Sequence, residues 1–133
     1  MPLGNWPIEY GGPPPASVGT GIMWDPAMTA LTPLFASIAA SGNGNNTVVA
    51  AVTGKKIRVL AYNFMANGTV NAKWQSGAGG TDLTGLKYLV ANTGLVAPFN
   101  PVGWFETAAA ALLNLNLSAG IAVGGELVYV TVI

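Results

Sequence analysis

The side chains that could do chemistry in this 133-residue chain are few. Its five carboxylates are Glu9, Asp25, Asp82, Glu106 and Glu126, its Lys and Arg residues also number five, and it has neither His nor Cys. A Ser-His-Asp triad, a Cys-His nucleophile and the usual zinc ligands therefore have no residues to form them. We predict no catalytic residue, no cofactor and no metal site, and we expect that the protein is not an enzyme.

One enzymatic alternative uses carboxylates alone. Two of them could meet in space as the acid and base of a small glycan-active enzyme. Each stands by itself in the sequence, beside turn or strand-end residues, where a solvated or capping role is sufficient. A calcium loop would need several oxygen ligands at short spacing, and a phosphate-binding loop ending at Gly54-Lys55-Lys56 would need Gly where the chain has Val49. The carboxylate pair is therefore the remaining enzymatic hypothesis.

Charge is scarce along the whole chain. The formal net charge is zero and 8% of the residues are charged, against roughly 25% in ordinary soluble proteins. The one basic cluster, Lys55, Lys56 and Arg58, is too small to follow a phosphate backbone, so we expect no nucleic-acid partner. These three residues either end a strand in water or form a salt bridge with an acidic partner. The low charge predicts a surface solubilised by Asn, Thr, Ser and Gly or one covered by partner proteins, and we favour the second.

No segment is apolar enough to span a membrane. The longest stretch without a charge, residues 26–54, contains Pro33 and the polar run 41–47, so it lacks the roughly 20 apolar residues of a spanning helix. The N-terminal residues include Glu9 and several prolines in place of a basic segment followed by an apolar one, so no export signal is expected. We therefore expect no membrane partner.

Proline divides the chain into an N-terminal arm and a later domain. Seven of the nine prolines lie in residues 1–33. Proline removes a backbone donor and fixes φ, so this segment is predicted to be an extended arm and not a central strand or a long helix. The arm also holds large apolar side chains, which a solvated linker would not need. These side chains either fold back onto this subunit's own core or lie on neighbouring subunits, and we favour the second alternative. They include Trp6, Ile8, Tyr10 and Trp24.

Residues 34–133 have the pattern of short strands separated by Gly and Asn. In the clearest strand, Val70, Ala72 and Trp74 alternate with polar residues, which predicts one buried face and one wet face. In residues 113–118, Leu residues alternate in the same way with Asn and Ser. Asn67-Gly68 is typical of a type I′ turn and predicts a hairpin between the strand at 56–66 and the one that follows. Further strands are expected at 47–52, 86–90, 95–97, 104–107 and 126–133, the last after a turn at Gly124-Gly125.

This pattern predicts an all-β fold, an antiparallel β-sandwich of jelly-roll or Greek-key type, preceded by the Pro-rich arm. The four Trp residues could stack on sugars, but Trp74 lies on the alternating apolar face and is expected in the core. Trp104, in the loop at 101–106, is the candidate for an exposed aromatic platform.

Several stretches of the predicted sandwich resemble a family of virion proteins of tailed bacteriophages. They are residues 48–60 (VVAAVTGKKIRVL), 99–107 (FNPVGWFET), 113–118 (LNLNLS) and 124–130 (GGELVYV). Over residues 34–133 the chain is similar to small jelly-roll proteins and domains encoded with phage heads and tails. The role that fits best is that of a capsid decoration, or cement, protein, and the arm lies outside the resemblance.

The resemblance implies a structural role on the outer surface of a phage head. Decoration proteins of this kind are commonly trimers and bridge neighbouring major capsid subunits without doing chemistry. The implied partners are two further copies of the chain in a homotrimer and the major capsid protein, and the implied location is the virion. Because similar modules recur in fibres and spikes, a receptor-binding or carbohydrate-binding module of a tail fibre is the alternative, with Trp104 as its platform.

We expect the arm to supply part of the partner interface. Aromatic side chains dominate interface energetics, and an arm stiffened by proline loses less conformational entropy when it docks. The expected interface residues are Trp6, Ile8, Tyr10, Trp24, Lys55, Lys56, Arg58 and Trp104.

Overall fold

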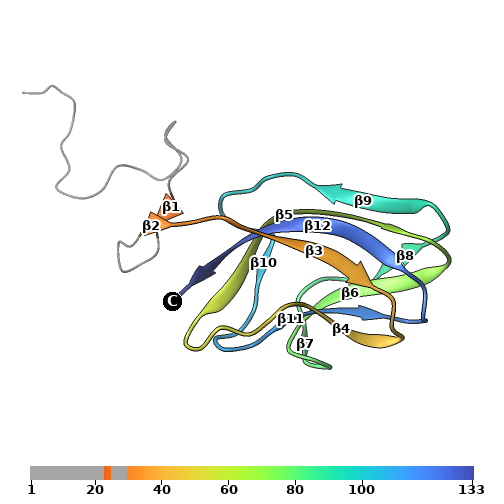
Figure 1. Ribbon diagram of the computed structural model, residues 1–133, viewed down its shortest axis with the longest axis horizontal. Coiled ribbons are helices and arrows are strands. Elements are labelled where there is room, and N and C mark those ends of the chain that lie inside the picture. Colours follow the sequence, from red (N-terminus) through yellow and green to blue (C-terminus); the bar gives the residue numbers. More distant parts are fainter. Residues whose placement is uncertain (1–22, 25–29) are drawn as a thin grey trace, which may run out of the picture. The chain divides into compact units, whose positions relative to one another are not determined.

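The computed structural model describes residues 23–24 and 30–133 of the chain (Figure 1). The chain divides into two units, Met1–Thr32 and Pro33–Ile133. In the first unit, β1 (Met23–Trp24) pairs antiparallel with β2 (Ala30–Leu31). Trp24 therefore lies in a two-residue strand. Most of the predicted extended arm lies outside the described residues, as do three of its candidate anchors, Trp6, Ile8 and Tyr10.

The second unit consists of two antiparallel sheets that pack face to face. The first sheet has the strand order β10-β5-β12-β3, and β9 also pairs with β5; the second has the order β4-β11-β6-β7, and β8 also pairs with β6. No helix occurs in residues 23–24 and 30–133, and in this part of the chain no helix could therefore cross a membrane. The structure confirms the predicted all-β antiparallel sandwich. Its strands are β3 (Leu34–Ala40), β4 (Gly44–Val49), β5 (Lys56–Ala66), β6 (Val70–Ser76), β7 (Thr81–Asp82), β8 (Lys87–Leu89), β9 (Thr93–Ala97), β10 (Phe105–Glu106), β11 (Leu113–Leu117) and β12 (Val123–Val132).

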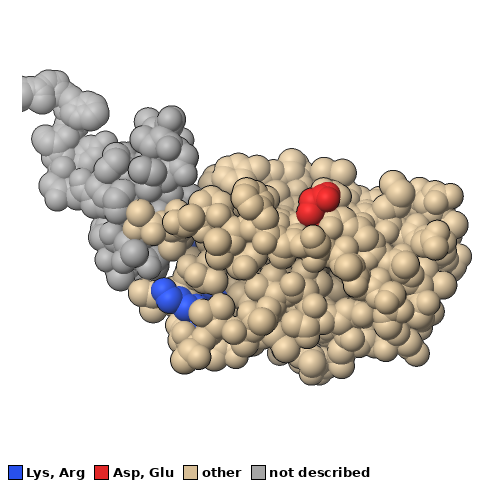
Figure 2. Space-filling view, in the orientation of Figure 1, with Lys and Arg blue, Asp and Glu red and all other residues tan. Residues whose placement is uncertain are grey.

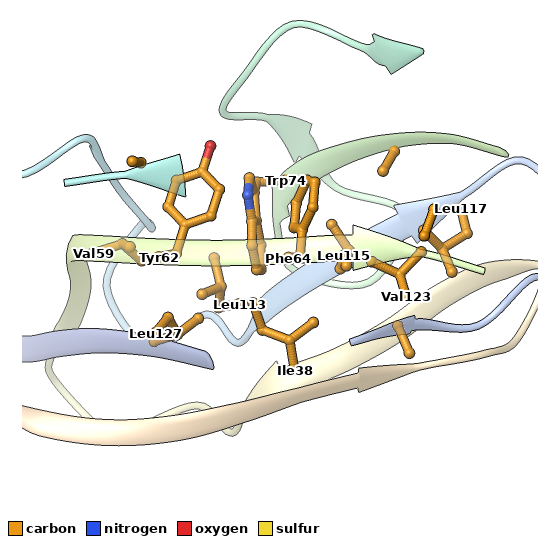
Figure 3. Close-up of a cluster of buried hydrophobic side chains, with 14 of the residues drawn as sticks. Ile38, Val59, Tyr62, Phe64, Trp74, Leu113, Leu115, Leu117, Val123 and Leu127 are labelled. Atoms are coloured by element: carbon orange, nitrogen blue, oxygen red, sulfur yellow. The ribbon is translucent and has the colours of Figure 1, made fainter. Parts of the chain in front are cut away.

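The core lies between the two sheets, because alternate side chains of each strand point inward (Figure 3). On β6, Val70, Ala72 and Trp74 are buried, whereas Asn71 and Lys73 are partly exposed, which confirms the alternation predicted for this strand. The long strand predicted at 56–66 is confirmed as β5. Burial of each large apolar side chain contributes roughly 1.5–3 kcal/mol, so these inner faces supply the main stabilising term of the fold.

Aromatic rings from both sheets meet at the centre of this core. The ring of Trp74, on β6, lies 5.4 Å from that of Tyr62, 6.2 Å from that of Phe64 and 5.6 Å from that of Phe105 (centroid distances). Trp74 is 0% exposed, so its predicted place in the core is confirmed. Burial also raises the pKa of the Tyr62 phenol above its ordinary 10.0.

The hairpin predicted at Asn67-Gly68 is wrong. β5 lies in the first sheet and β6 in the second, so the two strands do not pair and the chain crosses between sheets at this point. Neither residue has a positive φ, as a type I′ turn would require. Instead, the backbone N–H of Asn67 donates to the carbonyl of Ala122, and a Cβ on Gly68 would lie 3.2 Å from Cγ2 of Ile121. The Gly allows this crossing to pack closely against the segment that enters β12.

The turn predicted at Gly124-Gly125 is also wrong, because both residues lie inside β12. A Cβ on Gly125 would clash with the carbonyl oxygen of Asn63, on the neighbouring strand β5. This Gly therefore allows a close approach of two backbones within the sheet, and the bend occurs earlier, at residues 118–120.

The strand predicted at 47–52 is shifted as well, since β4 spans Gly44–Val49.

Replacement of an inner-face leucine should test this packing. Leu115, on β11, is 0% exposed, so Leu115→Ala should lower the free energy of unfolding by about 2–5 kcal/mol. The matched control is Leu86→Ala, at a site that is 41% exposed, where a change within about 0.5 kcal/mol is expected. Urea unfolding of both variants measures the difference, and equal losses would contradict the assignment of Leu115 to the core.

Candidate functional site

Three rows of residues that run across neighbouring strands form part of the outer face of the first sheet, which continues at the start of β5 with Lys56 and Arg58. The rows are Phe35, Val128 and Ala61; Ser37, Glu126, Asn63 and Val96; and Ala39, Gly124, Met65 and Gly94. We call these eleven positions the apolar face. Of their side chains, only those of Ser37, Asn63 and Glu126 are polar, so the face departs from the hydrophobic-in, polar-out alternation usual for an antiparallel sheet.

Large side chains on the apolar face are open to solvent. Phe35 is 80% exposed and Val96 is 75% exposed, and Met65 is exposed as well. A shallow depression between Phe35 and Val96 is also lined by Ala61, Pro98, Glu126 and Val128. Charged atoms cover only small areas of the molecular surface in the view of Figure 2. Large exposed apolar side chains gathered on one face of a sheet are typical of a protein-interaction site.

The outer face of the second sheet is polar, and its groups bind one another. Asn45 Oδ1 accepts hydrogen bonds from the backbone N–H of Gly79 at 2.9 Å, Asn114 Nδ2 at 2.9 Å and Asn116 Nδ2 at 3.2 Å. Asn114 Nδ2 also donates to Gln75 Oε1 at 2.8 Å. These contacts connect β4, β11 and β6 through side chains alone. The sequence placed Asn114 on a wet face, yet it is 0% exposed, because its neighbours in this network cover it.

The same network continues to β7 through a carboxylate. Gln75 Nε2 donates to Asp82 Oδ1 at 2.8 Å, and Lys73 Nζ lies 3.1 Å from Asp82 Oδ2. The hydrogen bonds from Gln75 and Lys73 lower the pKa of Asp82 below its ordinary 3.8. Asp82 stands alone in the sequence, but in the structure it has two close partners. Its ionised form accepts hydrogen bonds from Gln75 and Lys73.

A second ion-pair cluster occupies the start of β5. Arg58 Nη2 and Nε both lie 2.8 Å from Glu106 Oε1, and Lys56 Nζ lies 3.6 Å from Glu106 Oε2. The two residues face each other because Glu106, on β10, is the direct cross-strand partner of Arg58. Of the two alternatives for this basic cluster, a strand end in water or a salt bridge with an acidic partner, the salt bridge applies to Lys56 and Arg58, and its acidic group belongs to the same chain. Lys55 precedes β5 and makes no ion pair with the described residues.

The loop between β9 and β10 holds Trp104 in place. The indole Nε1 donates to the carbonyl of Pro98 at 2.8 Å, and the backbone N–H of Trp104 donates to Val59 on β5. The indole remains 46% exposed, and Phe99 and Val102 of the same loop are also exposed. The ring is therefore a fixed, partly open aromatic surface, next to the strand that carries Arg58.

The structure brings only some of the predicted interface residues together. Lys56, Arg58 and Trp104 lie along the start of β5 and its neighbouring strand, whereas Trp24 lies in β1 of the other unit. The apolar face was not predicted from the sequence. A signal for it exists, because β3, β5 and β9 carry apolar residues at positions that point to both sides of the sheet. Among the described residues, no three Asp or Glu side chains gather where they could hold a metal ion.

Removal of the Asp82 carboxylate should make stability less sensitive to acid. Because its folded pKa is lowered, the ionised group contributes stability above its unfolded value of 3.8, and this contribution is lost as the pH falls through the folded value. The urea midpoint of Asp82→Asn should therefore fall less steeply than that of the wild type between about pH 6 and about pH 2. Glu126→Gln, which removes an exposed carboxylate without an ion pair, is the matched control for the loss of one charge. Parallel pH profiles for Asp82→Asn and the wild type would contradict the assignment.

No protein-family model, curated protein or solved structure matches the chain. The geometry of the two outer faces, the ion-pair clusters and the Trp104 loop therefore carries the argument about function.

Proposed function

We propose that the protein is a structural virion protein of a tailed phage, one that decorates the outer surface of the head and joins neighbouring major capsid subunits. The observation that carries the proposal is the apolar face, with Phe35, Met65 and Val96 open to solvent on one side of the sandwich. A module that only holds other proteins together needs such a surface on a rigid support. The occupant that we assign to this face is an apolar surface of the capsid subunits that carries one Lys or Arg opposite Glu126.

The strand order supports a jelly roll, the type of sandwich on which the resemblance to decoration proteins rests. Six times along the chain, one strand and the next lie in opposite sheets: β3 and β4, β4 and β5, β5 and β6, β8 and β9, β10 and β11, and β11 and β12. The orders β3-β12-β5-β9 and β4-β11-β6-β8 together use eight strands, the number in a fold of two Greek keys.

The distribution of charge supports docking through the apolar face. The polar groups of the second sheet are satisfied by one another, so that side can face water without a partner. On the apolar face, Glu126 is the single charged residue. Covering this face therefore desolvates one charge, that of Glu126, and a basic group on the capsid surface opposite Glu126 would keep the free-energy cost of association low.

The arm contributes to the same attachment in this proposal. Trp6, Ile8, Tyr10 and Trp24 are its aromatic and apolar anchors, and its prolines limit the conformations that are lost on docking. Lys56 and Arg58 have a mainly structural part, since both already pair with Glu106, although the three residues together keep one positive charge.

A charge placed on the apolar face should weaken attachment to heads. Val96→Asp would bury an unpaired carboxylate on docking, so affinity for heads stripped of the protein should fall by about tenfold or more. The matched control is Tyr88→Asp on β8 of the second sheet, because Tyr88 is 78% exposed and Val96 is 75% exposed. Co-sedimentation of each variant with the heads measures binding, and unfolding curves show that both remain folded. Equal binding by the two variants would contradict the proposal.

The alternative is a carbohydrate-binding module of a tail fibre, and the Trp104 loop favours it. The hydrogen bond to Pro98 fixes the indole with one part open, as a sugar-stacking platform requires. In that case Trp104→Ala should abolish binding on a glycan array, and Val96→Asp should leave it intact. An array without hits for the wild-type protein would remove this alternative.

A further inference from the structure

The outer edge of β3 is an unprotected strand edge. β3 is the last strand of the first sheet, and within residues 23–24 and 30–133 it pairs only with β12. Its seven residues contain no charge and no proline, and its register with β12 has no bulge. Proteins usually protect such edges with charges, proline, bulges or very short strands, because the free N–H and C=O groups bind other strands.

The other described edges of the sandwich differ from β3. β4 pairs with β11 through a register shift, and β7 and β8 are short and carry Asp82 and Lys87. β10, at the other end of the first sheet, has two residues and carries Glu106, and β9 is uncharged but has five residues and includes Gly94. β3 is therefore the longest regular edge without a protecting feature in the described part of the chain.

The sequence of β3 is complementary to itself when two copies run antiparallel. If Ser37 lies opposite Ser37 of a second copy, Phe35 lies opposite Ala39 on the outer face. On the inner face, Ile38 lies opposite Ala36, and Leu34 lies opposite Ala40. Each large side chain then faces a small one, so neighbouring side chains fit without crowding. Phe35, which is 80% exposed, would gain a covered position beside Ala39 of the other copy.

We propose that β3 pairs antiparallel with β3 of a second copy of this chain. The two copies are related by a two-fold axis that passes midway between their Ser37 residues. The pairing joins two five-stranded sheets into one continuous sheet, and a two-fold contact is the commonest way in which identical chains associate. Since the axis is perpendicular to the sheet, the apolar faces of both copies lie on the same side and form one larger surface. This inference does not rest on the virion role, and it differs from the three-fold assembly that the resemblance implies.

The first test is the mass of the full chain in solution, measured by light scattering over a range of concentrations. The expected value is twice the 13.5 kDa of one chain. Ser37→Glu places two carboxylates opposite each other, next to Glu126 of each copy, its cross-strand neighbour on β12, so the mass should fall by half. The matched control is Thr47→Glu on β4, the exposed edge strand of the second sheet, which should keep the double mass. A wild-type mass of one or three chains overturns the proposal.

The second test uses the absence of cysteine from the chain. Opposed residues of an antiparallel pair have Cα atoms about 4.5–5.5 Å apart, within the range of a disulfide. Ser37→Cys should therefore form a disulfide-linked dimer under mild oxidation, whereas Thr47→Cys should stay largely monomeric on a non-reducing gel. Both substitutions are small and exposed, so loss of folding would not explain the difference. Equal cross-linking of the two variants overturns the proposal even if the chain is a dimer.

Discussion

The packing of the two sheets against each other is the constraint on which the other features depend. Trp74 from the second sheet meets Tyr62 and Phe64 from the first, and inward-facing leucines of β11 complete the contact (Figure 3). Because side chains alternate along a strand, burying one set determines which residues lie on the outer faces. The apolar face and the polar network of the second sheet are both consequences of this arrangement.

The two outer faces differ in polarity: that of the second sheet is polar and hydrogen-bonded, whereas the apolar face of the first sheet exposes large apolar side chains. On the second sheet, Asn45, Asn114, Gln75 and Asp82 satisfy one another, so few of these polar groups depend on a partner. On the first sheet, exposed apolar residues and the free edge of β3 leave surface that other chains can cover. Both proposals therefore concern the first sheet. Docking to a shell would cover its apolar face, and pairing of two copies would cover its edge at β3.

The predictions from sequence succeeded where burial is periodic and failed where Gly and Asn have several possible uses. Alternation on β6 and the extent of β5 depend on local pattern, and both are confirmed. Asn67-Gly68 resembles a hairpin turn, but it serves a crossing between sheets, and Gly125 serves a close backbone approach inside β12. In each case the nearest contacts come from residues far away in the sequence, which local pattern does not reveal.

The sequence by itself determined the class of the fold, the scarcity of charge and the lack of His and Cys chemistry, because these follow from composition and from the spacing of apolar residues. Only the tertiary structure decided which strands are neighbours. That choice brought Glu106 to Arg58, covered Asn114 and left Phe35 and Val96 on one exposed face. Strand pairing depends on contacts between distant segments, whose free energies are collective, and no short stretch of the chain carries that information.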